Sequence, residues 1–398
     1  MSKKVIQINT VCYGSVGNIM KQIEIALLNK GYDTISFYGR GNGYSNLPCE
    51  RFGNFIGFWL HVVWTTITDK QGMQSYFATK KMITRLREEN PDVIHLHNIH
   101  GYYLNYPLMF KYLRKEFSGR LVWTFHDCWP MTGHCPYFTM KKCERWKELC
   151  KNCPNRKLYP ASWFADSSKS NYKKKKKMFS QIENMTIICP SVWMYNIVKE
   201  SFLKNANSIV ISNGIDLDIF YPRKENDLIK KYNIPNNKKI VLGVANIWEE
   251  RKGFGIFIEL AKAIGDNYII VLVGVNKHQV NKMLPNMIGI EKTDSKEELA
   301  EIYSCANVFM NPSEEESFSL VTVEALACGT PVIALDNSAV KEMINGENGI
   351  VLHNPEIRDY VQAISECESR NISEDIICRS VQRYNVDNMT NAILEVYK

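Results

Sequence analysis

The chain lacks any apolar run of the ~20 residues that a membrane-spanning helix needs. Its most apolar window, Phe52–Ile67, is shorter than that and contains Asn54, Gly57 and His61. The first residues lead straight into an expected strand rather than into a long apolar segment, so no secretion signal is expected. The window itself is open to three interpretations: a buried core helix, a surface lying on a membrane, or the wall of a substrate groove.

Several other common signals are missing as well. There is no short-period repeat, and the full G-x-G-x-x-G fingerprint of dinucleotide redox enzymes does not occur. The formal net charge of +7 over 398 residues is modest. Its one local concentration is the run Lys173–Lys177, and no aromatic-interleaved basic motif accompanies it. Nucleic acid is therefore not an expected partner, while a solvated helix face and an anionic membrane contact both remain open.

The length favours two domains, because single cores stop growing at ~250–300 residues. Short apolar runs alternate with amphipathic segments in both halves, which predicts two α/β domains with parallel sheets covered on both faces. A turn-rich joint, Ser212–Pro222, separates the halves. The expected strands are Val5–Thr10, Thr34–Tyr38, Val93–His97, Leu121–Phe125, Thr186–Pro190, Ile240–Ala245, Ile269–Val273, Val308–Met310 and Pro331–Ala334, and the helices include Ile19–Lys30, Leu104–Phe117, Phe254–Ile264 and Lys296–Ser304.

The stretch Asn311–Ala334, NPSEEESFSLVTVEALACGTPVIA, is the most informative part of the chain. Its pattern predicts a strand end, an acidic loop, a helix capped by Ser317 or Ser319, and a second strand. Glu316 would precede the helix and Glu324 would lie inside it. The backbone N–H groups of Ser317, Phe318, Ser319 and Leu320 would then face outward at the positive end of the helix dipole. Such donors bind phosphate, and flanking carboxylates bind hydroxyls, which together suit a sugar nucleotide.

This stretch resembles the E-x7-E motif of retaining glycosyltransferases of family 4, which have the GT-B fold. The resemblance implies two Rossmann-like, doubly wound domains facing a central cleft, with an N-terminal acceptor-binding domain over 1–218 and a nucleotide-sugar-binding domain over 219–380. A last helix within 381–398 is expected to return to the N-terminal domain. In the family, the first Glu contacts the transferred sugar and the second contacts the ribose, which here implies Glu316 and Glu324.

The resemblance extends to loops of the N-terminal half. Gly14 and Gly17, in GSVG, are similar to the family's glycine-rich loop near the donor phosphates, although a generic strand-to-helix turn has the same pattern. His126 follows the strand LVWTF, where a family His reaches the donor sugar, although a buried structural role is the alternative. His95, His97 and His100 in DVIHLHNIHG are expected to pack and hydrogen-bond rather than to catalyse.

In the C-terminal half the family usually places an Arg and a Lys near the diphosphate. Asn246 stands near the expected Arg, so the resemblance is weaker there, and Arg251 is a substitute for it. Lys252 matches the family Lys because Gly253 and a helix follow. Cations at a helix start oppose the helix dipole, which favours an anionic partner. Gly274, after YIIVLV, resembles a nucleotide-facing glycine, and Ile290 is expected to lie near the base.

Five of the 12 cysteines fall between Cys128 and Cys153. Within this insert, 128–154, the thiols of Cys135, Cys143, Cys150 and Cys153 are a candidate structural zinc site, because four thiolates ending in C-x-x-C can hold a tetrahedral Zn²⁺. The spacings before the C-x-x-C are not those of a standard zinc ribbon, and small buried cysteines are the alternative. This insert resembles one found in glycosyltransferases of colanic-acid and capsule assembly, where the pattern HD-x-W-x-x-TG-x-C recurs.

The expected activity is transfer of a hexosyl group, with retained configuration, from a nucleotide-diphosphate sugar to a lipid-linked saccharide acceptor. His126, Glu316 and Lys252 are the expected catalytic residues, and no catalytic metal is expected. The expected setting is cytoplasmic, at the inner face of the membrane, in exopolysaccharide or capsule synthesis. Two alternatives remain: a hydrolase or epimerase acting on sugars or sugar nucleotides, and a catalytically decayed scaffold stabilised by zinc.

Overall fold

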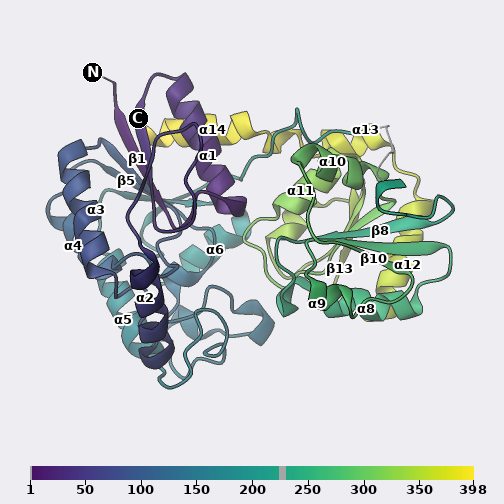
Figure 1. The fold of residues 1–398 in the computed structure, drawn as a ribbon, viewed down its shortest axis with the longest axis horizontal. Coiled ribbons are helices and arrows are strands. Elements are labelled where there is room, and N and C mark those ends of the chain that lie inside the picture. Colours follow the sequence, from purple (N-terminus) through teal and green to yellow (C-terminus); the bar gives the residue numbers. More distant parts are fainter. Residues whose placement is uncertain (1, 224–229) are drawn as a thin grey trace. The chain divides into compact units, whose positions relative to one another are not determined.

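Strands and helices alternate along the whole computed structural model, which describes residues 2–223 and 230–398. The chain divides into an N-terminal unit, Met1–Ser212 with Met389–Lys398, and a C-terminal unit, Asn213–Asn388 (Figure 1). From the sequence, these boundaries were expected after residues 218 and 380, whereas the structure divides the chain after residues 212 and 388. The last helix, α14 (Val386–Tyr397), begins in the C-terminal unit and ends in the N-terminal one.

The sheet of the N-terminal unit has seven parallel strands in the order β3-β2-β1-β4-β5-β6-β7. The order reverses beside β1, as in doubly wound folds, where ligands bind at the carboxyl ends of the strands. The strands are β1 (Lys4–Asn9), β2 (Asp33–Tyr38), β3 (Cys49–Arg51), β4 (Val93–Leu96), β5 (Arg120–Thr124), β6 (Met185–Cys189) and β7 (Asn207–Val210). The helices are α1 (Gly14–Asn29), α2 (Phe55–Thr68), α3 (Tyr76–Glu89), α4 (Tyr106–Lys115), α5 (Ser168–Phe179) and α6 (Val192–Glu200).

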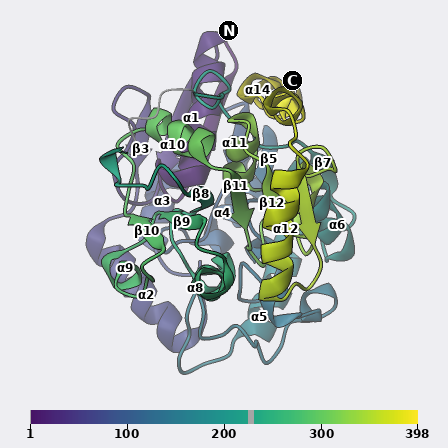
Figure 2. The same cartoon turned by 90° about the vertical axis from the view of Figure 1, so that its right-hand side faces the viewer.

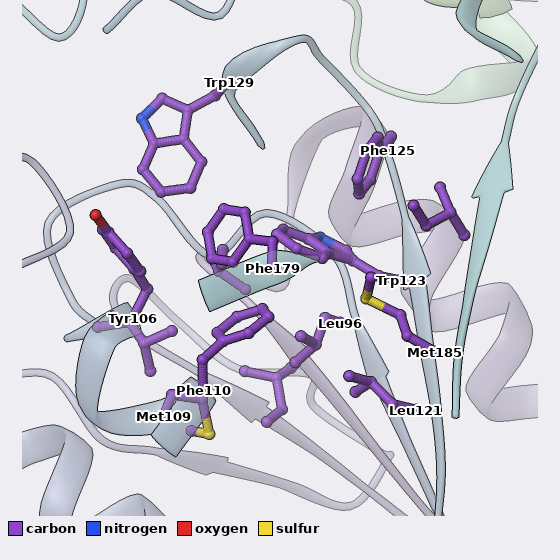
Figure 3. Packing of buried hydrophobic residues seen from close by; sticks show 14 of the residues in the cluster. Leu96, Tyr106, Met109, Phe110, Leu121, Trp123, Phe125, Trp129, Phe179 and Met185 are labelled. Atoms are coloured by element: carbon purple, nitrogen blue, oxygen red, sulfur yellow. The ribbon is translucent and has the colours of Figure 1, made fainter. Parts of the chain in front are cut away.

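One face of this sheet carries an aromatic core. The rings of Phe110 on α4, Phe179 on α5 and Trp123 on β5 turn toward one another (Figure 3), with ring centroids 4.5 Å apart for Phe110–Phe179 and 5.0 Å for Trp123–Phe179. The opposite face is more polar. There the Tyr397 hydroxyl of α14 lies 2.6 Å from Nδ1 of His95, which joins the end of the chain to this unit.

The sheet of the C-terminal unit has six parallel strands in the order β10-β9-β8-β11-β12-β13. Here too the order reverses in mid-sheet, beside β8. The strands are β8 (Lys239–Val244), β9 (Tyr268–Val273), β10 (Met287–Ile290), β11 (Val308–Asn311), β12 (Val332–Leu335) and β13 (Gly349–Leu352). The helices are α8 (Phe254–Ala263), α9 (Lys277–Val280), α10 (Lys296–Cys305), α11 (Leu320–Ala327), α12 (Ile357–Ser369) and α13 (Glu374–Arg379).

Both faces of the second sheet are covered by helices. Successive side chains along a strand point to opposite faces, so neighbouring residues such as Val241 and Leu242 enter different cores. Helices α8 and α12 cover one face, and Figure 2 shows α12 lying along β11 and β12. Helices α10 and α11 cover the other face (Figure 1). Strands buried on both sides explain the near-continuous apolar runs such as Tyr268–Val273.

Each strand expected from the sequence is present within one or two residues of its expected limits, and so are three of the four expected helices. The fourth, α1, begins at Gly14, five residues before the expected Ile19. The short strands β3, β7 and β13 were not expected. Two expectations about surfaces need correction. The window Phe52–Ile67 does form a helix, α2, but the buried-core interpretation is wrong, because most of its apolar side chains are exposed. The lysine run is also not wholly solvated, because Lys175 is buried, donates to Trp129 O at 2.6 Å and lies 3.3 Å from the Trp129 ring centre.

Candidate active site

The loop between β11 and α11 brings a cation and a carboxylate together in the C-terminal unit. Lys252, at the end of a single 3-10 turn before α8, forms an ion pair with Glu316, and both side chains are largely buried. Gly253 follows with φ +79°, and a Cβ there would lie 2.6 Å from Cγ of Pro312. The absence of a side chain therefore lets the turn that carries Lys252 approach the loop that carries Glu316.

Arg251 lies next to Lys252 and makes hydrogen bonds to other residues of the C-terminal unit. Its Nη1 donates to the carbonyl of Glu315 at 3.1 Å, and its Nε donates to the Glu249 carboxylate at 3.0 Å. Its carbonyl accepts from the N–H of Glu314 at 2.8 Å. Arg251 thus fixes the acidic loop, and it brings positive charge to the place that the sequence assigned to a diphosphate.

Helix α11 begins where the sequence placed a phosphate-binding helix start. Ser319 is its N-cap residue, one of the two positions expected, but its hydroxyl makes no capping bond. Instead Asn311 Nδ2 donates to the hydroxyls of Ser319 at 3.0 Å and Thr322 at 2.9 Å. The Ser319 side chain therefore does not cap the first N–H groups of the helix, and uncapped N–H groups suit an anion there. Phe318 is buried against Tyr384, so only its backbone faces this site.

Glu324 lies one turn into α11 and is half-buried. The hydroxyl of Tyr303, on α10, donates to its Oε2 at 3.1 Å. Burial raises the pKa of the Glu324 carboxyl to about 7. A carboxylate kept at such a place, with one neutral donor as partner, is typical of a binding site rather than of a structural ion pair.

The remaining expected donor-site residues follow β9 and β10. Gly274 has φ +87°, and its N–H donates to the carbonyl of Ile290 at 2.8 Å. A Cβ at Gly274 would lie 1.7 Å from the carbonyl oxygen of Ala245, so no other residue fits. Ile290 itself is buried in the core, so its side chain is covered. Leu320 and Ser317 are partly exposed at the start of α11.

In the N-terminal unit, the glycine loop after β1 opens helix α1 as the sequence indicated. Gly14 has φ +70° and is the first helical residue. Gly17 lies so near the preceding loop that a Cβ would come within 2.5 Å of the carbonyl carbon of Cys12. The loop backbone consequently packs directly on the first turn of α1, at the carboxyl end of the sheet.

His126 follows β5 at the same end of the sheet and is neutral, because burial lowers its pKa to about 4. A chain of hydrogen bonds fixes its tautomer. The Gln7 amide donates to Met20 O at 3.1 Å and to Glu24 at 2.8 Å, so its oxygen accepts from Nε2 of His97 at 3.2 Å. Nδ1 of His97 then accepts from Nε2–H of His126 at 3.0 Å, which leaves Nδ1 of His126 as an acceptor. His95, His97 and His100 are buried and hydrogen-bonded, as expected for structural residues.

The four cysteines of the insert lie against the same apolar core of the N-terminal unit. The thiols of Cys135 and Cys153 are hydrogen-bonded, and this bond together with burial raises the pKa of Cys153. The N–H of Gly133 donates to Sγ of Cys150 at 3.2 Å, and the electrostatic influence of Cys143 reaches Cys150 as well. Over residues 2–223 and 230–398, however, no three His, Cys, Asp or Glu side chains are arranged to hold a metal ion. The structural zinc stays a prediction.

The sequence did not point to Tyr303, Asn311 or Arg40 as parts of a site. Tyr303 and Asn311 carry the hydrogen bonds of Glu324 and Ser319, which depend on how α10, β11 and α11 pack together. Arg40 follows β2 at the carboxyl edge of the N-terminal sheet, beside an apolar hollow. Only its position after an expected strand could have drawn attention to it.

Family models match almost the whole chain. The model for Glycosyltransferase Family 4 covers residues 20–219, and that for Glycosyl transferases group 1 covers residues 224–380. The chain belongs to glycosyltransferase family 4. Membership makes it a glycosyltransferase.

Curated relatives of this family-4 glycosyltransferase are distant in sequence. The putative colanic acid biosynthesis glycosyl transferase WcaC of Escherichia coli K12 is 25% identical over 294 residues, covering 70% of this chain and 68% of WcaC. The D-inositol 3-phosphate glycosyltransferase of Mycolicibacterium smegmatis is 29% identical over 173 residues, covering 40% of each chain. The chain therefore spans about two thirds of the first of these relatives and less than half of the second.

Solved structures match over nearly the full length. Sucrose-phosphate synthase from Thermosynechococcus elongatus is 19% identical with a TM-score of 0.73, covering 99% of this chain and 98% of that one. HepE from Anabaena, solved in complex with UDP and glucose, is 15% identical with a TM-score of 0.67, covering 99% and 98%. The family-4 glycosyltransferase has the two-domain GT-B fold. None of its described helices has the length and apolar character of a membrane span.

Proposed function

We propose that the protein moves a hexosyl group, with retention of configuration, from a nucleotide-diphosphate sugar to a lipid-linked saccharide. The observation that carries the donor assignment is the grouping of Lys252, Arg251 and Glu316 at the uncapped start of α11, one turn before Glu324. Positive charge, backbone donors and two carboxylates follow the order of a diphosphate between two polyols.

Relatives support the same donor class. HepE was solved in complex with UDP-glucose, and a GDP-mannose-dependent alpha-mannosyltransferase of Mycobacterium tuberculosis is 31% identical over 133 residues. The biological setting is supported by the name of WcaC, which assigns that protein to colanic acid biosynthesis. We infer that the protein works at the inner face of the cytoplasmic membrane, where a lipid-linked acceptor is presented.

In the proposed reaction, negative charge develops on the leaving diphosphate as the bond to the sugar breaks. Lys252, Arg251 and the first N–H groups of α11 stabilise that charge, which fills the role that a divalent metal has in other transferases. Glu316 accepts hydroxyl hydrogen bonds from the transferred sugar, and Glu324 accepts them from the ribose. His126 is the sugar-binding residue that we assign to the N-terminal unit. No covalent nucleophile is assigned.

The test is nucleotide binding and transfer by matched variants. Wild-type protein should gain thermal stability with one class of nucleoside diphosphate, since a ligand at 100 times its Kd stabilises by about 2.7 kcal/mol. Glu324→Gln should weaken binding about tenfold, because the ribose loses a charged acceptor. Glu316→Gln should bind nearly normally yet turn over about 10- to 100-fold more slowly. Glu347→Gln, at an exposed loop, is the control.

Unchanged transfer by both site variants would remove the donor assignment. Free monosaccharide without any acceptor product would favour the hydrolase alternative. The anomeric configuration of the product, read by NMR against that of the donor, decides whether configuration is retained.

A further inference from the structure

Helix α2 has its polar side inward and its apolar side outward. His61 and Thr65 are buried, and His61 is fixed by Ser75 Oγ at 2.9 Å and by the N–H of Gly72 at 3.0 Å. Phe55 and Leu60 are 72% and 66% exposed. The exposed apolar residues of the helix are Phe55, Ile56, Trp59, Leu60, Val63, Trp64 and Ile67.

Two neighbouring segments extend this apolar face. Phe77, at the start of α3, is 85% exposed. Trp163 and Phe164, 67% and 76% exposed, stand on a loop held to α2 because the Trp163 N–H donates to the carbonyl of Thr66 at 2.9 Å. Water-exposed aromatic side chains gathered in this way are typical of a surface that meets a membrane or a partner.

The charge around the apolar face favours a membrane over a protein partner. Between residues 51 and 87 the only acidic residue is Asp69, and it is buried against His134. The exposed charges of the same stretch are cationic and include Arg51, Lys70, Lys80 and Lys81. An apolar, aromatic surface whose rim on α2 and α3 carries exposed cations complements an anionic lipid surface.

A hollow of about 660 Å³ lies beneath the N-terminal half of α2. Apolar and aromatic side chains line it from α2, from the start of α3 and from the loops after β2 and β4, among them Phe58, Phe77, Tyr102 and Tyr103. Since β2 and β4 end there, the hollow opens at the carboxyl edge of the sheet, where doubly wound folds bind ligands.

Arg40 stands at the wall of this hollow without a counter-charge. Its guanidinium lies 5.0 Å above the ring of Phe58, and its Nε is buried with no hydrogen-bond partner. Among the described residues it forms no ion pair. Arg40 is partly buried, and an anion with an apolar body would suit both its charge and the apolar lining of the hollow.

We propose that this hollow binds the lipid part of the acceptor, a long-chain lipid phosphate drawn from the membrane. The alkyl chain lies along Phe58 and Phe77, the phosphate pairs with Arg40, and the outward face of α2 sits in the lipid headgroup region. The proposal rests on the proposed function, because it names the lipid class and the binding site of that acceptor.

The test is flotation of the full chain with three kinds of vesicle: neutral phosphatidylcholine alone, the same with phosphatidylglycerol, and the same with polyprenyl phosphate at equal charge. Wild-type protein should bind the polyprenyl phosphate vesicles about tenfold more tightly than the phosphatidylglycerol vesicles, the effect of a charge-assisted contact. Arg40→Gln and Ala78→Trp, the second of which fills the hollow, should lose this preference and keep phosphatidylglycerol binding. Arg40→Lys should keep part of the preference.

Matched controls lie on the same unit. Arg120→Gln removes an exposed charge at the other end of the sheet, and Thr84→Trp adds the same ring to an exposed position of α3. Both should retain the preference. Trp59→Ser with Trp64→Ser should weaken binding to every vesicle, and thermal unfolding confirms that each variant is folded. Inorganic phosphate at equal concentration should not compete, which distinguishes a lipid headgroup from free phosphate.

Equal binding of the two anionic vesicles, a full preference in Arg40→Gln, or a dimer formed through α2 with no vesicle binding would overturn the proposal. Nucleotide binding and transfer to a water-soluble acceptor are measured on the same samples. Transfer without lipid preference rejects the lipid site alone, whereas lipid preference without nucleotide binding rejects the proposed transferase reaction.

Discussion

At the scale of single residues, the site keeps groups that work against stability. Glu324 lies on a helix that packs against the core, where an apolar residue would be expected. Burial raises the pKa of its carboxyl from an ordinary 4.5 to about 7. Arg40 likewise keeps a buried Nε without a partner. Such groups are typical of binding sites, where a ligand supplies what the folded chain does not.

The cost of Glu324 should appear as a pH dependence. Between pH 4.5 and about 7 the unfolded chain releases the Glu324 proton while the folded chain keeps it. The stability contributed by this group is therefore complete below pH 4.5 and is lost as pH rises to about 7. Glu324→Gln, which does not titrate, should become more stable than wild type across this window, by at most about 3 kcal/mol at pH 8. Urea unfolding at pH 5 and pH 8 measures the difference.

Glu347→Gln should show no such change between the two pH values, since Glu347 is exposed. If the difference in stability between wild type and Glu324→Gln were the same at pH 5 and pH 8, the Glu324 carboxyl would ionise without a penalty. The inference that a binding site keeps this carboxyl at a cost in stability would then lose its support.

At the scale of secondary-structure elements, the ends of strands decide the shape of the donor site. The turn after β9 passes so near to Ala245 that only Gly274 fits, and the turn before α8 needs Gly253 for the same reason. Each of these turns joins a strand to a helix. A shift of the backbone at Gly253 would therefore move Lys252, and a shift at Gly274 would move the start of α9.

Two glycines of the same unit provide a comparison. Gly274→Ala should destabilise the protein by more than about 1 kcal/mol, because it adds a positive-φ strain to a Cβ placed 1.7 Å from a carbonyl oxygen. Gly255→Ala, on the exposed side of α8 with nothing within 4 Å, should be neutral or stabilise by up to about 1 kcal/mol. Urea midpoints and nucleotide affinity check both. Equal effects of the two substitutions would contradict this account of the β9 turn.

At the scale of the whole molecule, the cysteine insert has little regular secondary structure of its own. It contains three isolated 3-10 turns, Trp129–Met131, Thr139–Lys141 and Arg145–Lys147, and no long helix or strand. Its cysteines nonetheless lie on one apolar core, so a metal held by them would cross-link the insert.

Metal analysis of protein purified without chelators should find about one zinc per chain. Replacing Cys150 and Cys153 together by Ser should remove it, whereas Cys305→Ser, in the other unit, should not. Chelation should lower the unfolding midpoint before it lowers nucleotide affinity, because a structural metal contributes to folding rather than to donor binding. Protein with no zinc would leave the insert held by its apolar contacts and by the Cys135–Cys153 hydrogen bond.

The sequence by itself determined the strand and helix alternation, a helix start at Ser317 or Ser319, and the family, because these depend on local periodicity and on short motifs. It could not determine which side of α2 is covered, since periodicity separates two faces but does not say which one the fold buries. It also could not show that Lys175 turns inward onto Trp129 or that Tyr303 contacts Glu324. Those contacts join residues far apart in the chain, and only tertiary packing brings them together.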